Sequence, residues 1–238
     1  MTLYKIHFQS PILVDSYGSP FGMPILLIEN ILSKVPPSTS LANTLSKSYS
    51  LTHIKRIEFH NIESSEYSSI HSILTSIEDI LLSLSSKVIL ISEGHSSALS
   101  LQICNYYPEK IHIAYLVNPD FLFPMNEEFN PLKDFWDWFS KRDDFFLLLP
   151  KFPFVLDFYF KFLKFEELMA RQTSENNLHF ILTNRTPNSG FEVVRNIGKK
   201  VNISILENIP KDSILDTPVV CKMINWFLEK DNLQILKD

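Results

Sequence analysis

The sequence predicts an α/β fold, built on a mostly parallel β-sheet with helices on both faces. Short apolar runs bounded by turn-forming residues alternate along the chain with longer segments whose apolar residues recur at helical spacing. At 238 residues, 45% hydrophobic and 21% charged, the chain is also long enough to build one substantial core. Strands that alternate with helices favour parallel pairing, because each crossover helix returns the chain to the same end of the sheet.

The first strands are expected near the N-terminus. Ile12–Val14 and Pro24–Ile28 are short apolar runs, and Asp15–Pro20 between them is rich in residues that favour tight bends. Ile54–Phe59 predicts a third strand. The serine-rich stretch Ser38–Ser50 is interpreted as loops and helix caps.

The middle of the chain predicts a helix, a buried strand and a second helix. Ser68–Leu84 carries apolar residues at helical spacing, at Ile70, Ile73, Leu74, Ile77, Ile80, Leu81 and Leu84. Val88–Ala98 begins as a buried strand and turns abruptly at G-H-S-S-A, and Ser97–Tyr107 continues as a helix. Further strands are expected at Ile111–Val117, His179–Leu182 and Val201–Leu206, with a closing helix at Pro218–Leu228.

Composition excludes several classes of function. The net charge of −5, with no basic stripe, argues against nucleic-acid binding. No segment reaches the roughly 18 uninterrupted apolar residues of a membrane-spanning helix, the N-terminus lacks the pattern of a secretory signal, and no histidine pattern predicts a metal or other cofactor. Cys104 and Cys221, the two cysteines, lie in apolar helical patterns, so we expect reduced thiols and a cytoplasmic or other reducing compartment.

The turn at Gly94–Ala98 carries a motif. In the G-x-S-x-G pattern, a nucleophilic serine lies on a strained strand-to-helix turn, and small residues two positions before and after it keep the backbone from clashing. Gly94 and Ala98 flank Ser96 in this way.

The order of these elements resembles the α/β-hydrolase superfamily over most of the chain. The resemblance rests on D-S-Y-G-S-P-F-G-M-P-I-L-L-I at 15–28, G-H-S-S-A at 94–98, Y-P-E-K-I-H-I-A-Y-L-V-N-P at 107–119 and D-T-P-V-V-C-K-M-I-N-W-F-L at 216–228. These segments look like the first hairpin, the nucleophile turn, the following strand and the last helix of that superfamily. The resemblance implies a core built from residues 1–120 and 177–238, with residues 121–176 inserted as a helical cap.

The resemblance also implies a Ser-His-Asp triad, with Ser96 as the candidate nucleophile. The histidine is expected in the loop before the last helix, where counting back from Asp216 and Pro218 reaches Lys211. The last histidine of the chain is His179, so that loop holds none. The acid position falls on Asn184 or Thr186, neither of which carries a charge.

The oxyanion hole of the superfamily would use two backbone N–H groups, here those of Ser97 and Asn30. A backbone donor does not depend on the side chain, so this part of the site survives substitution. Glu29, beside Asn30, would place a carboxylate where negative charge develops and so oppose the reaction.

Three other residues offer substitutes for the missing partners. Lys211 would act as the base of a Ser-Lys pair if burial lowered its pKa, whereas the simpler interpretation is an exposed lysine in a loop. His95 adjoins Ser96, but neighbouring residues at a sharp turn project in different directions. Asp120 follows a predicted strand at a position that some members of the superfamily use for the acid.

The predicted cap is unusually aromatic. Phenylalanine, tryptophan and tyrosine concentrate between Phe121 and Phe165, and charged residues among them predict amphipathic helices. Phe135, Trp136, Trp138 and Phe139 are the candidate pocket residues. Three interpretations stay open: aromatics packed on the core, a pocket for a hydrophobic small molecule, or an exposed face that docks a protein partner or a membrane surface.

Two functions follow. The first is an α/β-hydrolase-fold protein that has lost its triad and acts as a non-catalytic binding or interaction module. The second is an active esterase or thioesterase on a hydrophobic acyl substrate that uses Ser96 with an atypical base.

Overall fold

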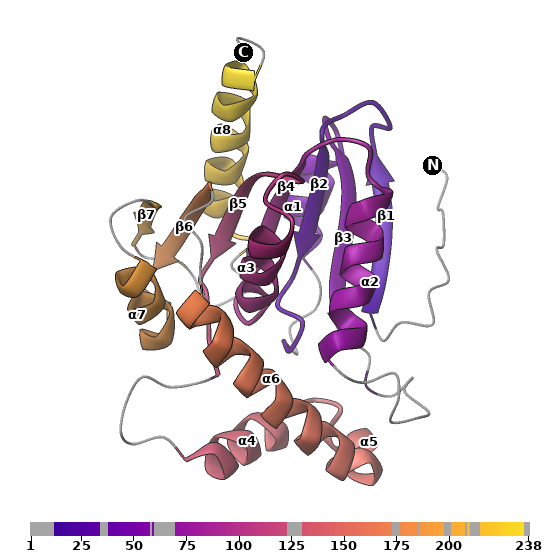
Figure 1. The fold of residues 1–238 in the computed structure, drawn as a ribbon, viewed down its shortest axis with the longest axis vertical. Helices are drawn as coiled ribbons and strands as arrows, with labels where there is room; N and C mark the ends of the chain where they lie inside the picture. Colours follow the sequence, from indigo (N-terminus) through magenta and orange to yellow (C-terminus); the bar gives the residue numbers. More distant parts are fainter. Residues whose placement is uncertain are drawn as a thin grey trace.

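The structure is a computed structural model that describes residues 12–33, 38–57, 59, 70–122, 130–172, 177–184, 186–197, 201–207, 209 and 215–235. A seven-stranded sheet forms the centre of this part of the chain (Figure 1). Its strands are β1 (Ile12–Gly18), β2 (Pro24–Ile28), β3 (Ser50–Ile57), β4 (Val88–Glu93), β5 (Ile111–Val117), β6 (Leu178–Thr183) and β7 (Asn202–Leu206).

The sheet has the order β1-β3-β2-β4-β5-β6-β7. Strands β2 to β7 are parallel, and β1 alone pairs antiparallel, with β3. This confirms the predicted mostly parallel sheet. The predicted first hairpin is wrong, because β1 pairs with β3 rather than with β2 and β2 lies between β3 and β4.

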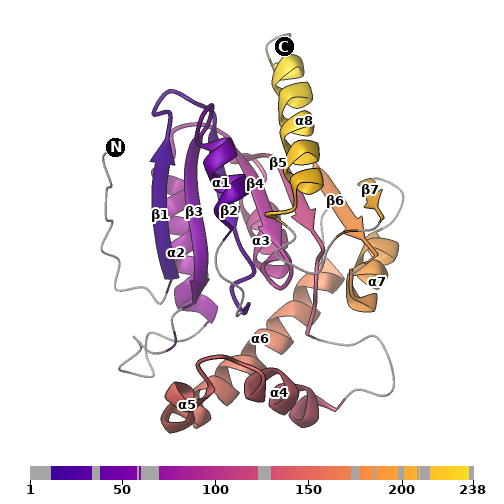
Figure 2. The same ribbon diagram turned by 180° about the vertical axis from the view of Figure 1, so that it is seen from behind.

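Helices cover both faces of the sheet, as predicted. α2 (Ile70–Ser83), α3 (Ser96–Tyr106) and α7 (Asn188–Ile197) lie on one face, and α1 (Ser40–Leu45) and α8 (Pro218–Ile235) lie on the other (Figures 1 and 2). Side chains of successive residues in a strand point to opposite faces. Leu26 and Ile28 accordingly join the cluster under α2 and α3, while Ile25 and Leu27 join the cluster under α1 and α8.

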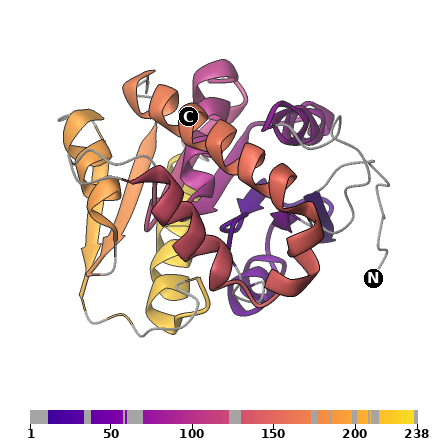
Figure 3. The same cartoon turned by 90° about the horizontal axis from the view of Figure 1, so that it is seen from below.

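The remaining helices lie beyond the carboxyl end of the parallel strands (Figures 1 and 3). They are α4 (Pro131–Ser140), α5 (Phe145–Leu148), a short 3-10 turn (Leu149–Lys151) and α6 (Phe152–Gln172), and we call residues 130–172 the α4–α6 unit. The Asn130 side chain accepts a hydrogen bond from the Lys133 N–H at 3.1 Å and so caps α4. α6 then runs back to the sheet and packs on α3.

Several elements differ from the prediction. β3 begins at Ser50 instead of Ile54, α1 lies in the stretch predicted as loops, and α8 continues to Ile235. α7 was not predicted. The two cysteines are free and buried, and no helix within the described ranges is long and apolar enough to cross a membrane.

Candidate functional site

The predicted site residues gather at the carboxyl edge of the sheet. Glu29 and Asn30 follow β2, Gly94 and His95 follow β4, and Asp120 follows β5. Ligands of open α/β sheets bind at this edge, because the loops after the parallel strands meet there. The sheet therefore brings together residues that are far apart in the sequence.

The turn from β4 into α3 depends on Gly94. Gly94 has φ +57°, a left-handed conformation, while His95 already has helical angles of φ −61° and ψ −23°. An ideal Cβ at Gly94 would lie 2.5 Å from Nδ2 and 2.8 Å from Cγ of Asn30. The left-handed conformation favours glycine at this position, and a Cβ there would force the Asn30 side chain to shift.

Ser96 is the first residue of α3 and is fully buried. Its hydroxyl donates a short hydrogen bond to the Glu29 carbonyl oxygen and accepts one from the Ile31 N–H at 3.0 Å. The hydrogen-bond acceptor of this hydroxyl is therefore a backbone carbonyl oxygen. The Ser96 side chain joins α3 to the loop after β2.

The two predicted oxyanion donors lie beside this turn. The Ser97 N–H donates to the Gly94 carbonyl at 3.1 Å, within the turn itself. The Asn30 side chain covers Gly94, and its Oδ1 accepts from the Leu32 N–H at 3.4 Å. Asn30 thus occupies the space directly above the β4–α3 turn.

His95 faces away from Ser96, toward β5 and the α4–α6 unit. Its Nδ1 lies 2.9 Å from the Asp120 carbonyl oxygen, and its Nε2 lies 3.6 Å from Asp120 Oδ2. Glu166 Oε1 on α6 lies 3.9 Å from His95 Nδ1. Asp120 therefore does have a histidine beside it, but this histidine does not contact the serine hydroxyl.

Glu166 is a residue of this site that the sequence interpretation missed. It is fully buried, and its Oε2 accepts a hydrogen bond from the Leu122 N–H at 2.5 Å. Burial, followed by the charges of Asp134, Glu166 and Asp120, raises the pKa of Tyr159. The signal was present, because Glu166 stands four residues after buried Phe162 on the core-facing side of an aromatic helix.

The Glu29 carboxylate turns away from the β4–α3 turn. It accepts from the Ser38 N–H at 2.5 Å and lies 2.8 Å from His53 Nε2, while His53 Nδ1 lies 2.7 Å from the Tyr17 hydroxyl. Burial, with the charges of Asp15 and Glu29 as smaller causes, raises the pKa of Tyr17. This buried chain of polar groups joins β1, β3 and the loop after β2.

The predicted acid position carries a neutral network. The hydroxyls of Thr183 and Thr186 donate to Asn118 Oδ1 at 2.8 and 2.7 Å, and all three residues are buried. Asn184 Oδ1 accepts from the Ile209 N–H at 3.4 Å. Lys211, the residue at the histidine position, lies outside the described residues.

Asp216, near the start of α8, fastens the C-terminal part of the chain to the loop before α1. Its Oδ1 accepts from the Ser38 hydroxyl at 2.6 Å and from the Ser40 N–H at 2.8 Å. Ser38 also donates to Glu29 through its backbone N–H, so Ser38 links Glu29 and Asp216 through one loop. Within the described ranges, no group of three or more His, Cys, Asp or Glu side chains is arranged to hold a metal ion.

The four candidate pocket residues of α4 have different environments. Phe135 and Phe139 are buried, and their rings stack with centroids 5.4 Å apart. Trp138 packs on Tyr159 at 5.5 Å, whereas Trp136 is 49% exposed. Two of the four rings therefore belong to the core, and one faces solvent.

Comparison with solved structures identifies the fold. An α/β-hydrolase enzyme from the metagenome of lagoon sediments at Mar Chica, Morocco, is 13% identical with a TM-score of 0.67, over 97% of this chain and 100% of that one. An α/β superfamily hydrolase from Oenococcus oeni is 15% identical (TM-score 0.63; 98% and 100% covered). A monoacylglycerol lipase from Paleococcus ferrophilus is 11% identical (TM-score 0.61; 92% and 99% covered).

Neither the protein-family models nor the curated proteins include a match to this sequence. At these low identities the structural likeness establishes the fold and no particular activity. The sheet order, the helices on its two faces and the near-complete coverage agree, and the chain has the α/β-hydrolase fold.

Proposed function

We propose that this chain has lost serine hydrolysis and acts as a non-catalytic binding or interaction module on the α/β-hydrolase fold. The observation that carries the proposal is the left-handed conformation of Gly94. In the nucleophile motif, the strained residue of the turn is the nucleophile itself. With Gly94 in that place, the motif is S-E-G-H-S at 92–96, and Ser92 and Ser96 are the small flanking residues.

Three features support the loss of catalysis. A glycine supplies no nucleophile, and Asn30 fills the space that a side chain at position 94 would need. Ser96 is buried, and its hydroxyl donates its hydrogen bond to a carbonyl oxygen instead of to a base. A serine hydroxyl is a weak nucleophile until a base removes its proton.

The alternative, an active esterase or thioesterase, requires more rearrangement. Ser96 would have to break its bonds to the loop after β2 and meet a base such as Lys211. Those bonds are buried, and breaking them leaves polar groups of Glu29 and Ile31 without partners.

The exposed apolar side chains of the α4–α6 unit are the surface that we propose for binding. Phe146 is 80% exposed, Leu147 69%, Leu132 63% and Trp136 49%. Several exposed large apolar side chains on one helical unit are characteristic of interaction sites. A hydrophobic small molecule or an apolar patch on a protein partner would bind to this surface.

Labelling with a fluorophosphonate probe tests the loss of catalysis. Wild type and Ser96→Ala, each checked for folding by circular dichroism, should both remain unlabelled under conditions that label an active lipase completely. Peptide mass spectrometry locates any label, so the assignment does not depend on the folding of the variant. Labelling at Ser96 would contradict the proposal, and Lys211→Ala would then test whether lysine is the base.

Binding of the apolar dye 1-anilinonaphthalene-8-sulfonate tests the exposed surface. Replacing Phe146 and Leu147 together by serine should reduce the dye fluorescence several-fold. Phe191→Ser, at a 41% exposed residue of α7, serves as the matched control and should leave it unchanged. Equal fluorescence in all three proteins would show that the α4–α6 unit is not the apolar binding surface.

A further inference from the structure

Strand β7 forms one edge of the sheet and presents an apolar face to solvent. Within the described ranges, β6 is the strand that pairs with it, and Figure 1 shows β7 at the end of the sheet. Ile203 stands in register with Phe180 and Ile205 with Leu182, and both partners belong to the cluster under α2, α3 and α7. Ile203 is nevertheless 48% exposed and Ile205 65%, so these two side chains extend the apolar surface beyond the core.

The outer side of β7 also presents backbone groups. The N–H of Asn184, just after β6, donates to the Leu206 carbonyl oxygen at 3.3 Å, so this carbonyl points toward β6. Peptide groups alternate in direction along a strand. Those of Ser204 therefore also face β6, and the N–H and C=O groups of Ile203 and Ile205 face outward. Within the described ranges, no strand pairs with this outer side.

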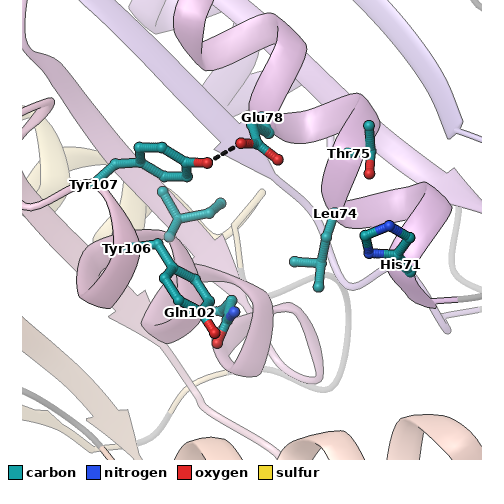
Figure 4. Close-up of a pocket in the computed structure, with 8 residues that line it drawn as sticks. His71, Leu74, Thr75, Glu78, Gln102, Tyr106 and Tyr107 are labelled. Atoms are coloured by element: carbon teal, nitrogen blue, oxygen red, sulfur yellow. Dashed lines mark hydrogen bonds between the residues drawn. The ribbon is translucent and has the colours of Figure 1, made fainter.

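The cavity between α2 and α3, on the same face of the sheet as Ile203 and Ile205, illustrates a polar pair that is closed within the chain. The Tyr107 hydroxyl donates to the Glu78 carboxylate there, so these two groups satisfy each other (Figure 4). The outward peptide groups of β7 point away from β6 instead, and water or a further strand satisfies them.

The opposite edge of the sheet is protected in ways that β7 is not. β1 has an irregular register between Ile12 and Val14, and it carries Asp15, which forms an ion pair with Lys55. Bulges and charges of this kind keep edge strands from pairing with other chains. β7, with the sequence N-I-S-I-L, has no charge, proline or glycine, and it pairs with β6 in continuous register. Its edge is therefore open to a further strand.

The sequence of β7 favours a second copy of itself as that strand. Ile-Ser-Ile reads the same in both directions, so a two-fold axis at Ser204 places Ile203 of each antiparallel strand opposite Ile205 of the other. Every outward N–H and C=O group of these isoleucines then has a partner, and their side chains form apolar pairs on one face. A two-fold pairing of this kind closes on itself and leaves no further edge.

We propose that two copies of this chain pair through β7 and form one continuous sheet across a two-fold axis at Ser204. This interface is separate from the exposed surface of the α4–α6 unit and from the β4–α3 turn. It is therefore independent of the proposed loss of hydrolysis.

Sedimentation equilibrium tests the dimer. With rising concentration, the mass of the wild-type protein should change from that of one chain to that of two. A single-chain mass at every concentration up to the solubility limit would overturn the proposal.

Substitutions at Ile205 test the backbone pairing. Ile205→Pro removes an outward N–H and leaves the bonds to β6 in place, since proline is tolerated on an edge strand where its nitrogen faces solvent. It should raise the dissociation constant of the dimer at least about tenfold, because the two-fold axis makes the loss occur twice. Ile205→Leu keeps the N–H and the volume, so it is the matched control and should change the constant by less than about threefold. Equal constants for two variants that are both folded by circular dichroism would refute pairing through β7.

Hydrogen exchange of the wild-type protein locates the interface without any substitution. The amides of Ile203 and Ile205 should become more protected as the concentration rises, whereas those of the α4–α6 unit should not. Replacing Phe146 and Leu147 together by serine should likewise leave the dimer intact. Protection confined to the α4–α6 unit, or dissociation of the dimer by this double substitution, would place the interface there and refute the proposal.

Ser204→Cys tests the register. An axis at Ser204 brings the two Cα atoms of this residue to about 4.5 Å, a separation that a disulfide can span. Oxidation should therefore link the variant into dimers on a non-reducing gel. The wild-type protein, whose Cys104 and Cys221 are buried, is the control and should remain unlinked. A variant that sediments as a dimer but forms no link would refute the axis at Ser204.

Discussion

A substitution at Gly94 tests the geometry of the β4–α3 turn directly. Gly94→Ala adds one methyl group to a residue with φ +57°, at a point where the new Cβ would lie 2.5 Å from Asn30 Nδ2. Two separate penalties follow. One comes from the backbone conformation and the other from the displaced Asn30 side chain.

Their magnitudes follow from general values. A left-handed conformation costs a residue with a Cβ about 1–2 kcal/mol, and forcing a neighbour to move in a packed site costs about 1–2 kcal/mol more. The total, about 2–4 kcal/mol, corresponds to a fall of roughly 4–16 °C in Tm for a chain of this size. Asn30→Ala removes the amide that the new methyl group meets. The double variant should therefore recover only the part of the lost stability that comes from displacing the Asn30 side chain.

Urea unfolding of wild type, both single variants and the double variant measures this coupling as a double-mutant cycle. We expect a coupling free energy of about 1–2 kcal/mol between the two positions. A loss below about 0.5 kcal/mol for Gly94→Ala would refute the left-handed turn. Zero coupling with a large loss would refute the contact with Asn30 and retain the conformational argument.

Three further predictions concern stability and are measured by urea unfolding. Ser96→Ala should lose about 2–4 kcal/mol of stability, because it leaves two buried backbone groups unpaired. Ser100→Ala removes a buried hydroxyl of α3 that has no partner among the described residues, so it should lose less than about 1 kcal/mol. Equal losses would contradict the role of the Ser96 bonds. Phe139→Ala should lose about 3–5 kcal/mol because the ring is fully buried, and Phe146→Ala, at an 80% exposed ring, should change stability by at most about 0.5 kcal/mol. Burial raises the pKa of Cys104 from 9.0 to about 12, so the folded state holds this proton more tightly than the unfolded chain does. The resulting contribution to stability is complete below pH 9 and is lost as the pH rises toward 12. Cys104→Ala should therefore reduce the alkaline loss of stability by up to about 1.4 kcal/mol per pH unit, and an unchanged pH dependence would rule this out.

The polar groups at the carboxyl edge of the sheet bond mainly to one another and to loop backbone. Ser96 joins α3 to the loop after β2, and Thr183 and Thr186 bond to Asn118. The bonded groups stabilise this edge, whereas the buried hydroxyls of Ser92 and Ser97 beside the β4–α3 turn have no hydrogen-bond partner among the described residues.

The sequence pattern at the β4–α3 turn fits two different arrangements of the motif. Small residues stand at Ser92, Gly94, Ser96 and Ala98. The spacing of small residues around a central position therefore fits both G-H-S-S-A, with Ser96 in the centre, and S-E-G-H-S, with Gly94 in the centre. The backbone angle of Gly94 distinguishes the two arrangements, and no periodicity of the sequence encodes it.

Short elements were the hardest to predict. α1 has six residues, S-L-A-N-T-L, and lies among serines, so it offers too few apolar positions for a helical period to be recognised. The first half of β3, S-L-T-H, places His53 among core residues, where it is acceptable only because Glu29 and Tyr17 bond to it. These partners belong to other strands and loops.

The sequence by itself determined the class of this protein: strands alternating with helices, a mostly parallel sheet and an aromatic helical segment after β5. Local periodicity encodes these features, because apolar residues recur every two positions in strands and every three to four in helices. The tertiary structure alone decided which residue stands at the strained turn, what covers it, and where Ser96, His95 and Glu166 point. Those outcomes depend on contacts between residues that lie tens of positions apart in the chain, and only the assembled sheet and helices bring them within hydrogen-bond distance.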